Sequence, residues 1–263
     1  IMASKRERKR IMNNLYMSSL LKAFDILDCF DDDQQERGIS DISAMIGLPS
    51  SSVHRLIQSL EFEGLLVQNK ENRKYALGSK MLYYAQKCGQ YQRCQDIAAK
   101  YTDELCRITE ENANIAISSG DRVANIYTAE THYILRPNFP LYKPYPAHCT
   151  GVGRVFLSHM NVGVQKYIYQ NNADAIGMPQ EAFLEMLHTA RCNGYALDDQ
   201  AFNAGLRCVA APIYLSGNKL IFALSVSAPA ARMSDAAYEK ARKLVMEYAE
   251  LISQEIQAAE FRF

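Results

Sequence analysis

The sequence predicts an α+β fold in two domains, a small one of three helices and a β-hairpin and a larger one of antiparallel strands and helices. Apolar residues recur at helical spacing between residues 18 and 60. Short strand-like segments flank polar turns at residues 65–77, 115–128 and 209–227. A chain of 263 residues, 48% of them hydrophobic, is long enough to form two apolar cores.

The first domain begins with an amphipathic helix over residues 18–30. After a polar loop, a second helix begins at Ser40, which we expect as its cap, and ends at Gly47. Ser50 or Ser51 caps a third helix, which ends at Gly64. We expect the following residues on the inner faces of these helices: Leu20, Leu21, Phe24, Leu27, Phe30, Ile42, Met45, Ile46, Val53, Leu56, Ile57 and Leu60.

The third helix carries a polar face, so the second and third helices together indicate a helix-turn-helix. Two short strands, residues 65–68 and 73–77, then flank the turn at residues 69–72, which completes a winged helix-turn-helix. Arginine can pair with guanine and glutamine with adenine, whereas basic side chains on the wing suit phosphates. The residues that we expect to contact DNA are Ser51, Ser52, His54, Arg55, Gln58, Lys70, Arg73 and Lys74.

Basic residues are concentrated at positions 5–10, which form either a solvated tail or an arm lying along DNA. We therefore divide the chain into four parts: an arm (1–17), a winged helix-turn-helix (18–78), a linker helix (79–94) and a second domain (95–260). In the second domain we expect strands at 115–118, 123–128, 209–215 and 220–227, helices at 151–160 and 179–193, and a terminal helix capped by Ser234.

Composition excludes several classes of protein. No apolar run is long enough for a transmembrane helix, and the first residues lack the apolar region of a secretory signal. Seven cysteines without CxxC pairs suit free thiols in a reducing cytoplasm. The adjacent His148 and Cys149 lack a third residue to orient the histidine, so we expect no enzyme. A metal site would have to combine His148, Cys149, His159, His188 and Cys192, whose spacing matches no tight pattern, so we expect neither metal nor cofactor.

Three blocks of sequence resemble the IclR family of bacterial transcriptional regulators. The first runs from Gly47 to Leu60 (GLPSSSVHRLIQSL) and continues at YALG (75–78), the second is PAHCTGVGRVFL (146–157), and the third combines GYALDD (194–199), GLRCVAAP (205–212) and LSVS (224–227). The resemblance covers about residues 18–256. It implies a GAF-like effector-binding domain after the winged domain, and homodimers or dimers of dimers on palindromic operators in double-stranded DNA.

The resemblance also implies a small-molecule pocket lined from the second and third blocks. Carried onto this sequence, it names Gly151, Val152, Asp198, Leu206, Cys208, Ser225 and Ser227. The backbone amides of Thr150, Gly151 and Val152 would open a helix whose N-terminus attracts an anion such as a carboxylate. Ser225 and Ser227 share one face of a strand, so both hydroxyls can reach a ligand. Asp198 would accept hydrogen bonds from ligand hydroxyls or orient its loop.

The predicted function is a DNA-binding regulator, with a repressor of a catabolic operon preferred, that responds to a small organic or sugar acid. The alternative is a thiol-redox regulator using Cys149 or Cys208. Three segments depart from the family pattern: the Pro- and aromatic-rich stretch 135–146, Arg154 where lysine is usual, and residues 200–203 in place of an acidic run. Effector identity should therefore not be taken over from a relative.

Overall fold

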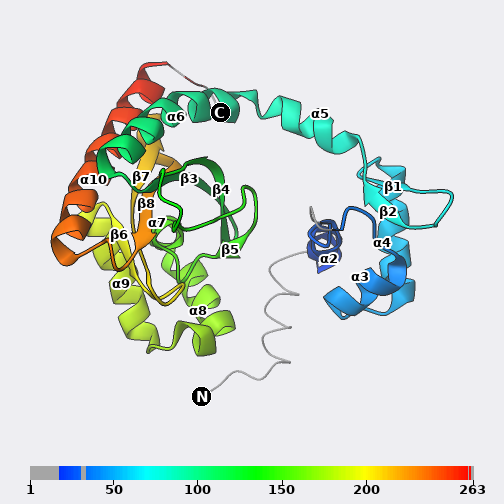
Figure 1. Ribbon diagram of the computed structural model, residues 1–263. Coiled ribbons are helices and arrows are strands. Elements are labelled where there is room, and N and C mark those ends of the chain that lie inside the picture. The colour runs from blue at the N-terminus through cyan, green and yellow to red at the C-terminus, as the bar shows by residue number, and fades with distance from the viewer. Residues whose placement is uncertain (1–17, 31–33, 260, 262–263) are drawn as a thin grey trace. The chain divides into compact units, whose positions relative to one another are not determined.

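The computed structural model describes residues 18–30, 34–259 and 261, which divide between Gly89 and Gln90 into two compact units (Figure 1). The segment 1–17, expected as a basic arm, lies outside the described residues. We call the two parts the N-terminal unit and the C-terminal unit and describe each by itself.

The N-terminal unit packs three helices against a two-stranded antiparallel hairpin, as predicted for a winged helix-turn-helix. Its core contains Ile26, Ile42, Val53, Ile57 and Leu66. The hairpin gains one further pairing, because Arg37 and Tyr75 exchange backbone hydrogen bonds of 2.9 Å. The elements are α2 (Ser18–Leu27), α3 (Ile39–Ile46), α4 (Ser50–Phe62), β1 (Leu66–Gln68), β2 (Tyr75–Leu77) and α5 (Lys80–Lys87).

The predicted N-terminal caps of α3 and α4 are wrong, whereas Gly47 ends α3 in a left-handed conformation, as predicted. Gly38 is the N-cap of α3, and the carboxylate of Asp41, in the first turn, accepts the Gly38 backbone N–H at 3.1 Å. Pro49 precedes α4 in an extended conformation. The serines expected as caps instead lie inside the helices: Ser40, Ser50 and Ser51.

Part of the predicted inner face is also wrong. Leu20 and Phe24 of α2 and Met45 of α3 are each more than half exposed, whereas Ile26 and Ile42 are fully buried. Each of these short helices has one buried residue, Ile26 in α2 and Ile42 in α3. The buried face of each helix is therefore narrow, and the apolar residues beside it remain at the surface.

Residues 79–94, expected as one linker helix, hold two helical segments. The first, α5, ends at Lys87, Cys88 is its C-cap, and α6 (Gly89–Thr109) begins directly after that residue. The helix α6 belongs to the C-terminal unit, because Cys94, Ala98 and Leu105 are buried in its main core.

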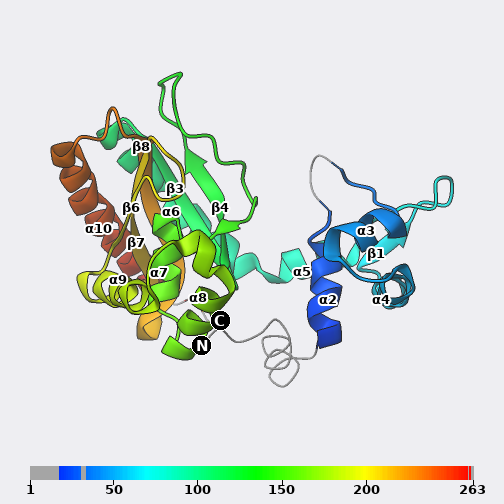
Figure 2. The same cartoon turned by 90° about the horizontal axis from the view of Figure 1, so that it is seen from below.

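The C-terminal unit is a six-stranded antiparallel sheet with helices on both faces (Figures 1 and 2). The strand order is β5-β4-β3-β8-β7-β6, so β8 and β7, close to the C-terminus, occupy the middle of the sheet beside β3. The strands are β3 (Asn112–Ser119), β4 (Arg122–Ala129), β5 (Tyr145–Pro146), β6 (Ala196–Asp199), β7 (Leu206–Leu215) and β8 (Lys219–Pro229). The helices are α6, α7 (Gly151–Ser158), α8 (Val162–Ile176), α9 (Gln180–Asn193) and α10 (Asp235–Ala258).

Each face of the sheet carries its own core. One core joins α6 and α10 to residues such as Ile115, Leu224 and Val226, and the other joins α7, α8 and α9 to Ala210 and Ala223. The alternation along β8 therefore turns Ser225 and Ser227 away from the α6–α10 face, as the sequence predicts. Ser234 is the N-cap of α10, with a hydrogen bond to the Ala237 amide, and this prediction is confirmed.

Within the described residues, no helix is long and apolar enough to cross a membrane.

Candidate functional site

The predicted DNA-contacting residues form the exposed side of α4 and the tip of the hairpin. Ser51, Ser52, His54, Arg55 and Gln58 are all exposed, because Val53, Ile57 and Leu60 turn the opposite side of α4 into the core. No salt bridge involves Arg55 in the part of the chain that the structure describes, so its guanidinium can serve a ligand without breaking a protein contact.

The hairpin tip, residues 69–74, is an ordered turn that carries the predicted wing cations. Lys70 and Arg73 are exposed and Lys74 is half-buried. Arg73 adopts a left-handed conformation with φ of 60°, and the Asn72 side chain accepts the Lys74 amide at 2.9 Å.

Glu36 holds this tip from outside the hairpin. One carboxylate oxygen accepts from the Asn69 side chain at 2.8 Å and the other accepts from the Asn72 side chain at 2.6 Å. These hydrogen bonds lower the pKa of Glu36, which therefore stays ionised. Sequence reasoning missed Glu36, because it lies 33 residues before Asn69 and only the tertiary fold brings the two together.

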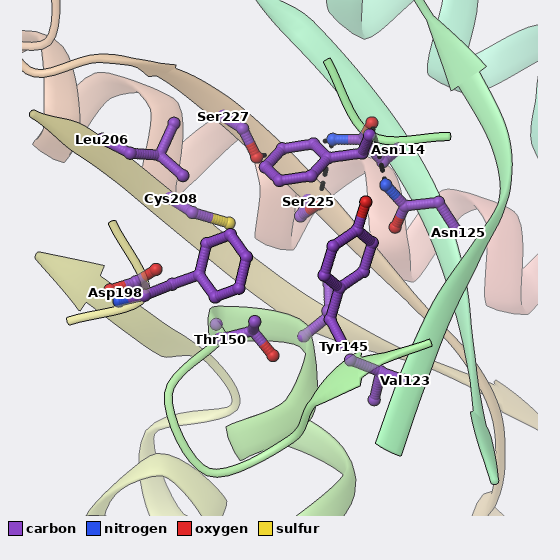
Figure 3. Close-up of a pocket in the computed structure, with 14 residues that line it drawn as sticks. Asn114, Val123, Asn125, Tyr145, Thr150, Asp198, Leu206, Cys208, Ser225 and Ser227 are labelled. Carbon is purple, nitrogen blue, oxygen red and sulfur yellow. Dashed lines mark hydrogen bonds between the residues drawn. The ribbon is translucent and has the colours of Figure 1, made fainter. Parts of the chain in front are cut away.

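In the C-terminal unit, the eight predicted effector residues meet around one cavity between the sheet and the start of α7 (Figure 3). The cavity has a volume of about 40 Å³. The predicted residues in its lining are Thr150, Gly151, Val152, Asp198, Leu206, Cys208, Ser225 and Ser227. Six further lining residues were not predicted: Asn114, Val123, Asn125, Phe139, Tyr145 and Phe202.

The start of α7 offers free backbone donors to this cavity. The hydroxyl oxygen of Thr150 accepts the Gly153 amide at 3.1 Å and caps the helix. The amides of Gly151 and Val152 donate no hydrogen bond to the described residues, as expected for a first helical turn. A carboxylate at this position would receive both N–H groups and the favourable end of the helix dipole.

The sheet side of the cavity is polar and internally hydrogen-bonded. The Asn114 amide nitrogen lies 3.4 Å from both the Ser225 and the Ser227 hydroxyl oxygens. The Asn114 amide oxygen accepts from the Thr128 hydroxyl at 3.0 Å and from the Asn125 amide at 3.4 Å. Several of these contacts are long, so a bound ligand can replace them at little cost.

Asp198 orients a loop. It is buried, and its Oδ1 accepts the backbone amides of Ala201 at 2.8 Å and Phe202 at 3.3 Å. Burial raises the pKa of the Asp198 carboxyl, although the two amides oppose this shift. The sequence suggested two roles for Asp198, accepting hydrogen bonds from ligand hydroxyls or orienting its loop. Its contacts in the structure correspond to the second role, because they hold the loop at residues 200–205.

The two cysteines of the redox alternative are poorly reactive. Burial raises the pKa of Cys208 to about 12, and burial also raises the pKa of the half-buried Cys149. Since the thiolate is the reactive form, neither environment activates its sulfur.

The histidines and cysteines considered for a metal site do not lie close enough together to bind one metal ion. Among the described residues, no cluster of three metal-ligating side chains occurs. His148 is buried and its pKa is lowered by that burial, while His159 binds the Tyr214 hydroxyl at 2.7 Å.

Comparison with known proteins agrees with both units. Residues 19–70 match the IclR helix-turn-helix domain, and residues 90–254 match the bacterial transcriptional regulator IclR C-terminal domain. The transcriptional regulator XynR of Escherichia coli is 30% identical over 84% of this chain and 89% of its own length. The transcriptional repressor AllR of Salmonella typhimurium is 25% identical over 82% of this chain and 81% of its own.

A solved structure has the same fold. It is an IclR homologue from Microbacterium hydrocarbonoxydans, complexed with 4-hydroxybenzoate, which superimposes with a TM-score of 0.66 at 21% identity. The match covers 92% of this chain and all of that one. With a family model spanning most of the chain and a relative at 30% identity, the chain belongs to the IclR family of bacterial transcriptional regulators.

Proposed function

We propose that this regulator binds a palindromic operator as a homodimer or dimer of dimers and that a small organic or sugar acid in the C-terminal cavity controls the binding. We further propose that it acts in the cytoplasm as a repressor of a catabolic operon. Its relative AllR is named a repressor, which supports this choice.

The DNA-binding part of the proposal rests on the exposed face of α4. Arg55 and Gln58 lie one turn apart on the exposed side, where they can reach base edges in the major groove. Lys70 and Arg73 extend from the hairpin tip, where they can contact phosphates.

The effector part rests on one observation: residues from the second and third blocks of sequence converge on a single cavity that combines free helix amides with hydroxyl and amide side chains. This chemistry suits a carboxylate with hydrogen-bonding substituents. The structural relative bound to 4-hydroxybenzoate also holds a carboxylate, which supports the same ligand class.

Control of DNA binding requires that the acid bind the two states of the regulator unequally. Half-sites of an operator lie at fixed spacing, so a small change in the placement of the paired winged domains loses contacts. Coupling between two sites typically amounts to about 1–3 kcal/mol, which corresponds to about 5–150-fold in affinity.

The thiol-redox alternative is disfavoured by the raised pKa values of Cys149 and Cys208. Peroxide treatment tests it directly. We expect mild peroxide to leave operator affinity unchanged in the wild type, in Cys149→Ser and in Cys208→Ser. A loss of affinity in the wild type that dithiothreitol reverses, and that either Cys149→Ser or Cys208→Ser abolishes, would establish the alternative.

The experiment that tests the main proposal begins with selection of genomic fragments by the purified protein, followed by footprinting. The selected operator is then titrated by fluorescence anisotropy with and without each member of a panel of carboxylates. We expect one palindromic site and at least one acid that changes its affinity. If the selection enriches no sequence, the DNA-binding part is contradicted. If no acid changes the affinity of the protein for the operator, the effector part is contradicted.

A further inference from the structure

Three aromatic side chains in the cavity lining form a cluster of their own. The ring centroids of Phe139 and Tyr145 are 5.6 Å apart, those of Tyr145 and Phe202 are 5.5 Å apart, and those of Phe139 and Phe202 are 6.0 Å apart. The first two pairs meet edge to face, at 81° and 88°, which is a favourable arrangement for aromatic rings. We call these three residues the aromatic cluster.

All three rings come from segments that depart from the family pattern. Phe139 and Tyr145 belong to the stretch 135–146, and Phe202 belongs to residues 200–203. The family resemblance therefore did not predict the cluster, in contrast to the glycines, serines and aspartate that it names.

The loop that carries Phe202 is fixed on both sides. Its amide and that of Ala201 are held by the buried Asp198 carboxylate, and the side chain of Gln200 accepts the Gly205 amide at 3.0 Å. A backbone hydrogen bond of 2.9 Å from Gln200 to Leu206 closes the loop.

The loop that carries Phe139 is anchored in the same way. The Asn112 side chain donates to the Pro137 carbonyl at 2.8 Å, and Arg232 donates to the Leu135 carbonyl at 2.9 Å. Beyond Phe139, the Tyr142 amide donates to the Asn125 carbonyl at 2.7 Å. The rings are therefore held in position by hydrogen bonds to the sheet and to α10's preceding turn, and an incoming ligand meets a preformed wall.

The space that remains is small. A volume of about 40 Å³ accommodates about three water molecules, whereas a cavity that admits benzene measures about 150 Å³. The Tyr145 hydroxyl makes no hydrogen bond to the described residues and points toward Asn114 and Asn125 (Figure 3). The cavity thus offers a ligand the unbonded hydroxyl of Tyr145, but it is too small for an aromatic ring.

We infer that the aromatic cluster is a size filter, which restricts the effector to short aliphatic carboxylates of about two to four carbons and rejects aromatic acids. The carboxylate lies at the start of α7, and the short chain lies beneath the rings of Phe139 and Phe202. Tyr145 supplies a hydroxyl to the polar end. This inference rests on the proposed function, because it specifies which acids the same cavity accepts.

The test removes one ring and asks whether a ring-shaped ligand can then enter. Full-length wild type, Phe202→Ala and Phe202→Leu are titrated by calorimetry with acetate, lactate, succinate and benzoate. We expect the wild type to bind at least one short acid about tenfold or more tightly than benzoate. We expect Phe202→Ala to bind benzoate about tenfold or more tightly than the wild type does, with Phe202→Leu in between.

Tyr142→Ala is the matched control, because the Tyr142 side chain is exposed and does not line the cavity, and the variant keeps the backbone amide that bonds to the Asn125 carbonyl. It should bind every acid as the wild type does. Circular dichroism establishes whether each variant is folded. If Phe202→Ala does not fold, the comparison is made with Phe202→Leu alone.

The outcomes separate the filter from the proposed function. Wild type that binds benzoate as tightly as its best short acid overturns the filter and leaves the acid effector intact. Folded Phe202 variants that gain no benzoate affinity also overturn the filter. If no carboxylate binds any of the proteins, the effector part of the proposed function fails, and the filter fails with it.

Discussion

The contact between α7 and the segment that precedes it gives a sharp stability prediction. A Cβ atom added at Gly153 would lie 2.1 Å from the Ala147 carbonyl oxygen and 2.3 Å from the Ala147 Cα. Both are backbone atoms, so relief requires the first turn of α7 to move about 1 Å away from residue 147. Overpacking of this kind costs about 1–3 kcal/mol.

We therefore expect Gly153→Ala to destabilise the C-terminal unit by about 1–3 kcal/mol, which lowers its melting temperature by about 2–12 °C. The displaced turn includes Thr150, and residue 147 follows β5 with Tyr145, so the cavity changes shape and effector affinity falls as well. Circular dichroism during thermal and urea unfolding measures the first effect, and calorimetric titration of the best-binding acid measures the second.

Gly89→Ala is the control. Gly89 is the exposed first residue of α6, and a Cβ atom there meets nothing within 4 Å. Alanine favours a helix over glycine, so this variant should be neutral or up to about 1 kcal/mol more stable. A Gly153→Ala protein that unfolds within about 0.5 kcal/mol of the wild type would refute the close approach between α7 and residue 147.

Three further predictions follow from other contacts. Arg55→Ala should lose about 1–3 kcal/mol of discrimination between operator and random duplex, whereas Lys74→Ala should weaken both about equally; anisotropy titrations at fixed salt decide, and unchanged preference in Arg55→Ala would contradict the placement of α4. Glu36→Ala should weaken operator binding several-fold although it removes a negative charge, because the hairpin tip loses its support; tighter binding would show that charge outweighs support. Asp198 keeps its proton to a higher pH when folded than when unfolded, so its ionisation destabilises the native state as pH rises. Asp198→Asn, which retains an acceptor oxygen, should then lack this pH-dependent loss in urea unfolding, and an identical pH profile in both proteins would exclude it.

Much of the candidate site could be predicted because its residues lie in compact motifs. Ser225 and Ser227 share a strand face through a period of two, which is a local property of the chain. The exposed side of α4 follows in the same way from helical spacing and the apolar residues Val53 and Ile57. The family resemblance supplied Gly151 and Asp198, which no periodicity indicates.

The missed cavity residues have a different origin. Asn114 and Asn125 lie on β3 and β4, and they reach the serines only because β8 pairs with β3 in the six-stranded sheet. Phe202 could not be placed from its loop, since its position depends on the buried Asp198 carboxylate. The helix α8 and the short strands β5 and β6 were missed because they are too short or too weakly patterned to stand out in the sequence.

By itself, the sequence determined the two-domain α+β organisation and the winged helix-turn-helix, and its resemblance to a known family named eight residues that line one cavity. These features depend on local periodicity and on motifs whose order along the chain is preserved. The tertiary structure alone decided how Glu36 supports the hairpin tip, which asparagines complete the polar wall, and how three aromatic rings limit the cavity to about 40 Å³. Such features join residues far apart in the chain, and their geometry arises only when the sheet pairs and the side chains pack at close density.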